Sequence, residues 1–214
     1  MIDAAETNMV AEYVLGSNQR LNAALAIYDA YDEIRKPVIK KFVSDLRDAI
    51  TSVLNAAAEK WAVNVRPDED WTWKRDCQLT VRHEAWQDGQ YVGVGAAKYG
   101  PADLWFGVWG ISDEGLAQRI LSHLNQRVVD GGWAAPTANP PRQWCYNFGN
   151  LFERRWELGD WRRTAAIQAM HEGKDGDYHK RTLDTIVEIA RATDEILRDQ
   201  VDISGSSLAA RRGA

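Results

Sequence analysis

Cysteine is scarce in this chain of 214 residues, which contains only Cys77 and Cys145. Two thiols so far apart in the sequence do not predict a disulfide framework, and we expect both to be reduced and buried in a cytoplasmic protein. Long hydrophobic runs are also missing, since no segment approaches the roughly 18 apolar residues that a membrane span needs. The acidic first residues do not have the pattern of a signal peptide. We therefore expect no membrane partner.

Positive charge is outnumbered, because 26 Lys and Arg residues stand against 31 Asp and Glu residues, for a formal net charge of -5. The chain as a whole does not attract phosphate backbones, so any nucleic-acid partner has to be held by a local basic patch. The composition is otherwise that of a globular protein, with 45% hydrophobic residues to build a core.

Tryptophan, in contrast, is abundant. The chain has ten, and all of them lie between Trp61 and Trp161. We expect the compact core, or a binding surface, in this middle part of the chain, with the two ends as helical packing partners.

Residues 77–110 have the turns and apolar runs of a small antiparallel sheet. Asp88-Gly89 is a strong two-residue hairpin signal, because a type I′ turn needs positive φ at both central positions. A second turn at Gly100-Pro101 leads into the apolar run 104–109. The sequence therefore predicts a three-stranded β-meander.

The hairpin turn determines which residues face each other across the first two strands. With Asp88-Gly89 at the tip, Glu84 lies opposite Gly93 and Arg82 lies opposite Gly95. Glycine leaves the backbone open to a close neighbour. Arg82 and Glu84 are therefore candidate binding residues on one face, while the alternate residues form an apolar face that helices must cover.

Helical periodicity flanks the sheet on both sides. Before the sheet, apolar residues recur at three and four positions over residues 18–61, where Pro37 predicts either a break or a bend. After the sheet, similar stripes lie in residues 112–128 and 183–201. The long first stripe suits packing against the sheet or the C-terminal helix, and it is also compatible with a homo-oligomer.

We predict an α+β fold, in which a small antiparallel β-meander is covered by long N-terminal and C-terminal helices. One domain is expected over residues 1–203, with a helical extension at 1–62, the sheet at 77–110 and helices at 112–201. Residues 204–214 have nothing to bury, so they are predicted to be a disordered tail.

The loop from His171 to His179 gathers histidine and carboxylate side chains that suit a metal ion. Its Glu172-Gly173-Lys174 matches the Glu-x-Lys half of a metal-dependent nuclease motif, in which carboxylates hold a divalent ion beside the lysine. That motif usually lies on a strand beside a second acid, whereas here it connects two helices. A solvated loop is the simpler interpretation, and we predict no metal site and no cofactor.

A second candidate site combines arginine with tryptophan, in Arg154-Arg155-Trp156 and in Trp161-Arg162-Arg163. Such combinations suit stacking on bases or anchoring of a protein interface. The alternative is that the tryptophans are core residues and the arginines extend over their edges. Trp161, Arg162 and Arg163 remain candidate anchors, with Arg154 and Arg155 as further binding residues.

The aromatic residues Phe148, Phe152 and Trp156 recur every four positions. This spacing predicts a helix in that segment, and it favours the core interpretation for Phe152 and Trp156.

Four segments carry a family resemblance: Leu104–Gly110, the Leu116–Leu124 helix, Trp144-Cys145-Tyr146 and the Leu183–Leu197 helix. Together they resemble the C-terminal portion of a group of bacterial and phage proteins in the PD-(D/E)XK nuclease superfamily, over roughly residues 35–200. The chain has no Asp followed by a strand-borne Glu-x-Lys upstream of the meander. The resemblance therefore implies an accessory or inhibitor-like module that lacks the catalytic half.

The function predicted from the sequence is a noncatalytic protein-binding module in bacterial phage defence or in a phage's counter-defence. The alternative is a divalent-metal-dependent nuclease or a nucleic-acid-binding accessory protein.

Overall fold

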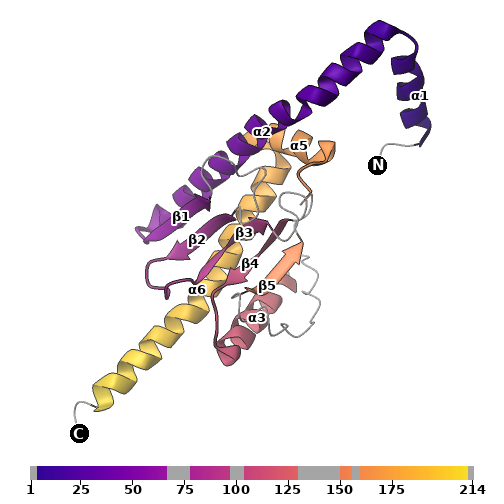
Figure 1. Ribbon diagram of the computed structural model, residues 1–214. Coiled ribbons are helices and arrows are strands. Elements are labelled where there is room, and N and C mark those ends of the chain that lie inside the picture. The colour runs from indigo at the N-terminus through magenta and orange to yellow at the C-terminus, as the bar shows by residue number, and fades with distance from the viewer. Residues whose placement is uncertain (1–3, 67–77, 97–103, 130–149, 156–159, 212–214) are drawn as a thin grey trace. The chain divides into compact units, whose positions relative to one another are not determined.

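The computed structural model describes residues 4–66, 78–96, 104–129, 150–155 and 160–211 (Figure 1). The chain divides into two compact units, Met1–Val38 and Ile39–Ala214. The boundary therefore lies well before the end of the helical extension that the sequence predicted. The predictions about the two cysteines lie outside the described residues.

The smaller unit contains α1 (Ala4–Leu15) and the first part of α2 (Asn18–Leu54). Ser17 precedes α2, and its side-chain oxygen accepts a hydrogen bond from the backbone N–H of Arg20 (3.3 Å), as an N-cap residue does. The Arg20 Nη1 donates to the carbonyl of Tyr13 (3.3 Å), and its guanidinium lies 4.1 Å from the centre of the Tyr13 ring. Arg20 thus joins the two helices.

Both long helices are continuous. α2 passes through Pro37 as one α-helix, so the break considered from the sequence does not occur. Proline removes only one backbone donor from the helix, and the turns that follow it are held by buried side chains, namely Ile39, Phe42, Val43, Leu46, Ile50 and Leu54. α6 (Asp177–Arg211) extends past Ser204, where a disordered tail was predicted.

The sheet has five antiparallel strands in sequence order: β1 (Trp61–Arg66), β2 (Gln78–His83), β3 (Tyr91–Ala96), β4 (Leu104–Trp109) and β5 (Asn150–Arg155). The central three strands are the predicted meander. β1 was not predicted from the sequence, and the β5 segment was predicted to be a helix. An aromatic spacing of four residues does not distinguish the two structures, because it also keeps side chains on one face of a strand.

The β2–β3 hairpin has a different register from the predicted one. Gln78, not Arg82, lies opposite Gly95, which is a shift of four residues, and Thr80 lies opposite Gly93. The loop therefore spans residues 84–90, and the turn inside it is closed by a hydrogen bond from the Gln90 N–H to the Gln87 carbonyl (3.1 Å).

The conformation of that turn also differs from the prediction. Gly89 has a φ of 87°, whereas Asp88 has no positive φ. A single positive φ at the third position fits a type II turn rather than type I′.

The predicted division of the sheet into two faces is kept, because a shift of four is even and side chains alternate with a period of two. Seven side chains of the apolar face are buried: Leu79, Val81, His83, Val92, Val94, Leu104 and Val108. α6 lies along the sheet and contacts β2, β3 and β4 (Figure 1). α3 (Glu114–Val129) and α5 (Thr164–His171) in turn contact α6. The larger unit is thus an α+β fold built on an antiparallel sheet.

Candidate interaction surfaces and a buried polar cluster

Trp161 precedes α5 and is completely buried, with 0% of its surface exposed. Its Nε1 donates a hydrogen bond to the hydroxyl of Tyr178 (3.2 Å), and its ring meets Phe42 edge-on at 5.8 Å. Phe42 also stacks on Tyr178 at 5.3 Å. Trp161 therefore belongs to the core where α2, α5 and α6 meet, and it cannot anchor a partner at the surface.

Arg162 and Arg163 are exposed, but both are paired with Asp160. The Nε of Arg162 lies 3.0 Å from one carboxylate oxygen, and the Nε of Arg163 lies 3.3 Å from the other. Burial raises the pKa of Asp160, but the hydrogen bonds and the charge of Arg162 more than offset this, so the pKa is lowered. The Asp160 carboxylate thus offsets part of the positive charge of Arg162 and Arg163, the two cations on which a local basic patch would depend.

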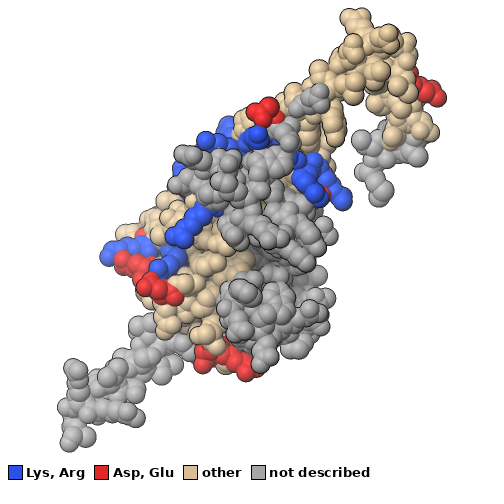
Figure 2. Space-filling view, viewed as in Figure 1, with Lys and Arg blue, Asp and Glu red and all other residues tan. Residues whose placement is uncertain are grey.

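Basic and acidic side chains are interspersed over the described surface seen in Figure 2, and the blue side chains do not form a single field there. Arg154 and Arg155 belong to β5, and their backbones pair with Phe106 and Trp105 of β4. Their side chains lie outside the described part of the chain.

Arg82 and Glu84 do not face the glycines of β3. The Nη2 of Arg82 donates to the carbonyl of Trp86 (2.8 Å) and pairs with Asp88 (2.7 Å), so Arg82 fixes the loop after β2. Glu84 is exposed and pairs with Lys60 (3.0 Å). Arg82 thus holds the loop after β2, and Glu84 connects the start of that loop to Lys60, the residue before β1.

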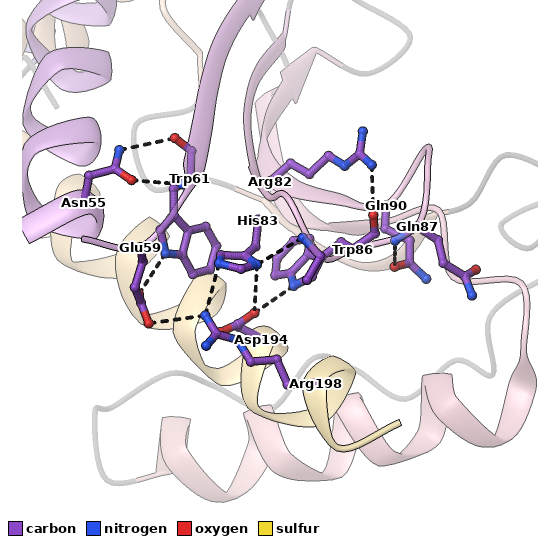
Figure 3. Close-up of polar contacts among 11 residues, drawn as sticks. Asn55, Glu59, Trp61, Arg82, His83, Trp86, Gln87, Gln90, Asp194 and Arg198 are labelled. Carbon is purple, nitrogen blue, oxygen red and sulfur yellow. Dashed lines mark hydrogen bonds and ion pairs between the residues drawn. The ribbon is translucent and has the colours of Figure 1, made fainter. Parts of the chain in front are cut away.

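Beside that loop, three aromatic rings gather where β1 begins and β2 ends (Figure 3). Trp61 meets His83 edge-on at 4.9 Å and Trp86 edge-on at 5.5 Å. All three side chains are buried. The backbone of Trp61 is held by the side-chain amide of Asn55, which accepts from its N–H (2.9 Å) and donates to its carbonyl (3.2 Å).

Asp194 and Arg198 of α6 connect to these rings. The buried carboxylate of Asp194 accepts a hydrogen bond from Trp86 Nε1 (2.9 Å) and pairs with Arg198 Nε (2.6 Å). The Nη2 of Arg198 lies 3.2 Å from His83 Nε2 and 3.2 Å from Glu59. Glu59 also accepts from Trp61 Nε1 (2.9 Å).

These contacts change the acidity of Glu59. The hydrogen bond from Trp61 lowers the pKa of its carboxyl, and the charge of Arg198 acts in the same direction, so Glu59 stays ionised at neutral pH. We define Glu59, Trp61, His83, Trp86, Asp194 and Arg198 as the α6 lock. Its donors and acceptors are directed at one another, which suits holding α6 on the sheet rather than chemistry on a substrate.

Glu172-Gly173-Lys174 begins at the end of α5 and continues into η3 (Gly173–Asp175). Lys174 pairs with Asp45 of α2 (3.6 Å), which also binds Lys41. Within the described ranges, no three His, Cys, Asp or Glu residues are grouped so that they could hold a metal ion. The motif therefore takes part in an ion-pair network between α2 and the loop before α6.

His179, in the first turn of α6, is buried, with 2% of its surface exposed, and meets Phe42 edge-on at 5.7 Å. Burial lowers the pKa of His179, and the negative charge of Asp45 offsets this only in part. His179 is therefore a neutral core residue at physiological pH, unlike the solvated loop residue expected from the sequence.

Exposed apolar side chains are concentrated in the smaller unit. Of the nine large hydrophobic residues that are exposed among the described side chains, eight lie between positions 9 and 34, and they are between 51% (Leu25) and 78% (Tyr28) exposed. We call these eight the N-terminal apolar surface: Met9, Val10, Tyr13, Leu15, Leu25, Ile27, Tyr28 and Ile34.

No candidate membrane span occurs among the described helices, because none combines the required length with sufficient hydropathy. Comparison with protein-family models, with curated proteins and with solved structures found no match to this chain. The resemblance to the nuclease superfamily stays a prediction.

Proposed function

We propose that this protein is a noncatalytic protein-binding module whose partner covers the N-terminal apolar surface. The exposure of these side chains is the observation that carries the proposal. Eight large exposed apolar residues in so short a part of the chain exceed the single scattered ones of an ordinary surface, and burying one such side chain contributes about 1.5–3 kcal/mol. A helix with apolar residues on several sides, as α2 has in this unit, is expected to be buried in a larger assembly.

A pull-down from bacterial lysate tests the proposal. The bait is the full chain, compared with Leu25→Asp combined with Tyr28→Asp, two exposed positions of α2. The matched control places the same charges on α3, as Gln118→Asp with Ser122→Asp, which are also exposed. We expect an identified partner to bind the purified wild type and the control but not the α2 variant. Equal binding to all three would contradict the proposal.

The runner-up function, a metal-dependent nuclease, makes a different prediction. Lys174 is engaged by Asp45, so we expect no cleavage of DNA or RNA in Mg²⁺ or Mn²⁺. The assay uses single- and double-stranded substrates with purified protein. Cleavage that is lost in Glu172→Ala or Lys174→Ala would overturn the noncatalytic assignment.

A nucleic-acid-binding role would depend on Arg162 and Arg163, which are exposed cations. Such binding falls steeply with salt, because each neutralised phosphate releases counterions. Tight oligonucleotide binding that weakens with salt and is lost in Arg162→Ala with Arg163→Ala would favour this alternative. The setting in phage defence or counter-defence rests on the family resemblance alone.

A further inference from the structure

One side of α2 in the smaller unit carries apolar residues with the spacing of a coiled-coil seam. Ala23, Ile27, Ala30 and Ile34 follow one another at intervals of four, three and four, and all four are exposed. Leu25 and Tyr28 point to a different side of the helix, because each residue turns the direction by about 100°. We call Ala23, Ile27, Ala30 and Ile34 the α2 seam.

The α2 seam alternates large and small side chains. Two helices pack closely when a large residue of one fills the space above a small residue of the other. In an antiparallel pair of identical helices related by a two-fold axis between positions 28 and 29, Ile27 meets Ala30 of the second copy and Ile34 meets Ala23 of the second copy. Every layer of this seam is then a large residue on a small one.

We propose that the α2 seam binds a second copy of this chain in this antiparallel register. The inference rests on the proposed function, because Ile27 and Ile34 belong to the N-terminal apolar surface, and it names the occupant of that part. The interface is self-complementary, as a two-fold dimer requires. It extends over 12 residues, or about 18 Å of helix, so the dimer dissociates on dilution.

Layer packing favours the antiparallel register over a parallel one. Arg20 lies one turn before the seam and is exposed. A parallel pair in register would place Arg20 against Arg20, Ile against Ile, and Ala against Ala, with like charges together and gaps at the Ala layers. The antiparallel pair instead places Arg20 opposite Pro37 and an Ile opposite an Ala in every layer.

Sedimentation equilibrium of the full chain tests the dimer. We expect a monomer–dimer equilibrium whose dissociation constant rises at least about tenfold in Ile27→Asp with Ile34→Asp. The matched control, Gln118→Asp with Ser122→Asp on α3, adds the same charges outside the smaller unit and keeps the wild-type constant. Circular dichroism confirms that each variant is folded.

A wild-type monomer at every concentration would overturn self-pairing, and so would equal weakening by both variants. Neither result decides the outcome of the pull-down, which measures the binding of a different protein to the same unit. The two proposals therefore fail separately.

Disulfide formation tests the register. In a background with Cys77→Ser and Cys145→Ser, Ala23→Cys and Ile34→Cys proteins are oxidised alone and as a mixture. The antiparallel seam predicts a disulfide-linked dimer in the mixture and little in either protein alone. Efficient linking of Ala23→Cys to itself would show parallel pairing and contradict the proposed register.

Discussion

Asp194 links the loop at the end of the sheet to helix α6, which lies along the sheet. Its carboxylate accepts the buried N–H of Trp86 and pairs with Arg198, so one side chain satisfies groups from the loop after β2 and from α6. A buried N–H that loses its acceptor costs about 1–3 kcal/mol. The stability of the α6 lock is therefore expected to depend on Asp194 more than on its exposed members.

We predict that Asp194→Ala lowers the free energy of unfolding by about 2–3 kcal/mol, because Trp86 Nε1 loses its buried acceptor. Asp194→Asn keeps an acceptor oxygen and is expected to cost less. Asp184→Ala, an exposed position of the same helix, is the control and should change stability by no more than about 0.5 kcal/mol. Urea denaturation measures all three. Equal effects at 184 and 194 would rule out the lock.

His179 makes stability depend on pH. Burial lowers the pKa of its imidazole below the ordinary value of about 6.5, so on acidification the unfolded chain binds a proton before the folded chain does. The contribution of His179 is therefore fully present above pH 6.5 and is lost as the pH falls through the lowered folded-state pKa.

We predict that the difference in unfolding free energy between wild type and His179→Gln becomes smaller from pH 7.5 to pH 5. Glutamine does not titrate in this range, so the comparison isolates the histidine. Denaturation curves at several pH values provide the measurement. A difference that is constant across the range would mean that the imidazole titrates alike in the folded and unfolded states.

At the scale of elements, the close packing of β2 on β3 explains the glycine at position 93 of β3 but not the one at position 95. A Cβ at Gly93 would lie 1.9 Å from the carbonyl oxygen of Leu79, which is far inside contact distance. A Cβ at Gly95 would meet only Gln78 and Trp109, at 3.6 and 3.9 Å. The two positions therefore differ, although the sequence predicted a close neighbour at both.

We predict that Gly93→Ala destabilises the protein by about 3 kcal/mol, since β2 and β3 must separate to admit the methyl group. Gly95→Ala is the matched control on the same strand and should change stability by no more than about 0.5 kcal/mol. Thermal and urea denaturation distinguish the two. Similar melting temperatures for both variants would show that β2 does not approach Gly93 closely.

Alternation of apolar residues was sufficient to predict the three central strands and their two faces from the sequence. It was insufficient for the register of β2 on β3, because Trp86 lies in the loop, where it is buried and bonds to Asp194, instead of continuing β2. It was also insufficient for β5, where a spacing of four is compatible with both helix and strand.

The α6 lock itself could not be predicted, since Trp86 and Asp194 are 108 positions apart in the sequence. A partial signal was present: Asp194 follows Thr193 within the buried stripe of α6, where an acid needs a partner. The burial of Trp161 was likewise undetermined, because arginine beside tryptophan is typical both of core edges and of interfaces.

At the scale of the whole molecule, the two units differ in how far their large apolar side chains are exposed to solvent. Among its described side chains, the larger unit exposes one large apolar residue, Val53, and it buries all four tryptophans whose side chains are described: Trp61, Trp86, Trp109 and Trp161. The smaller unit exposes eight large ones. This contrast supports the proposal that Met1–Val38 binds the partner and that the sheet and its helices have a supporting role.

Photo-crosslinking in bacterial cells tests this assignment most directly. A benzophenone amino acid replaces Tyr28, the most exposed residue of the N-terminal apolar surface, or Gln118 on the exposed side of α3 as the control. On irradiation, we predict a discrete protein adduct from position 28 and none from position 118. No adduct from position 28, or the same adducts from both positions, would contradict the proposal that this unit binds a protein partner.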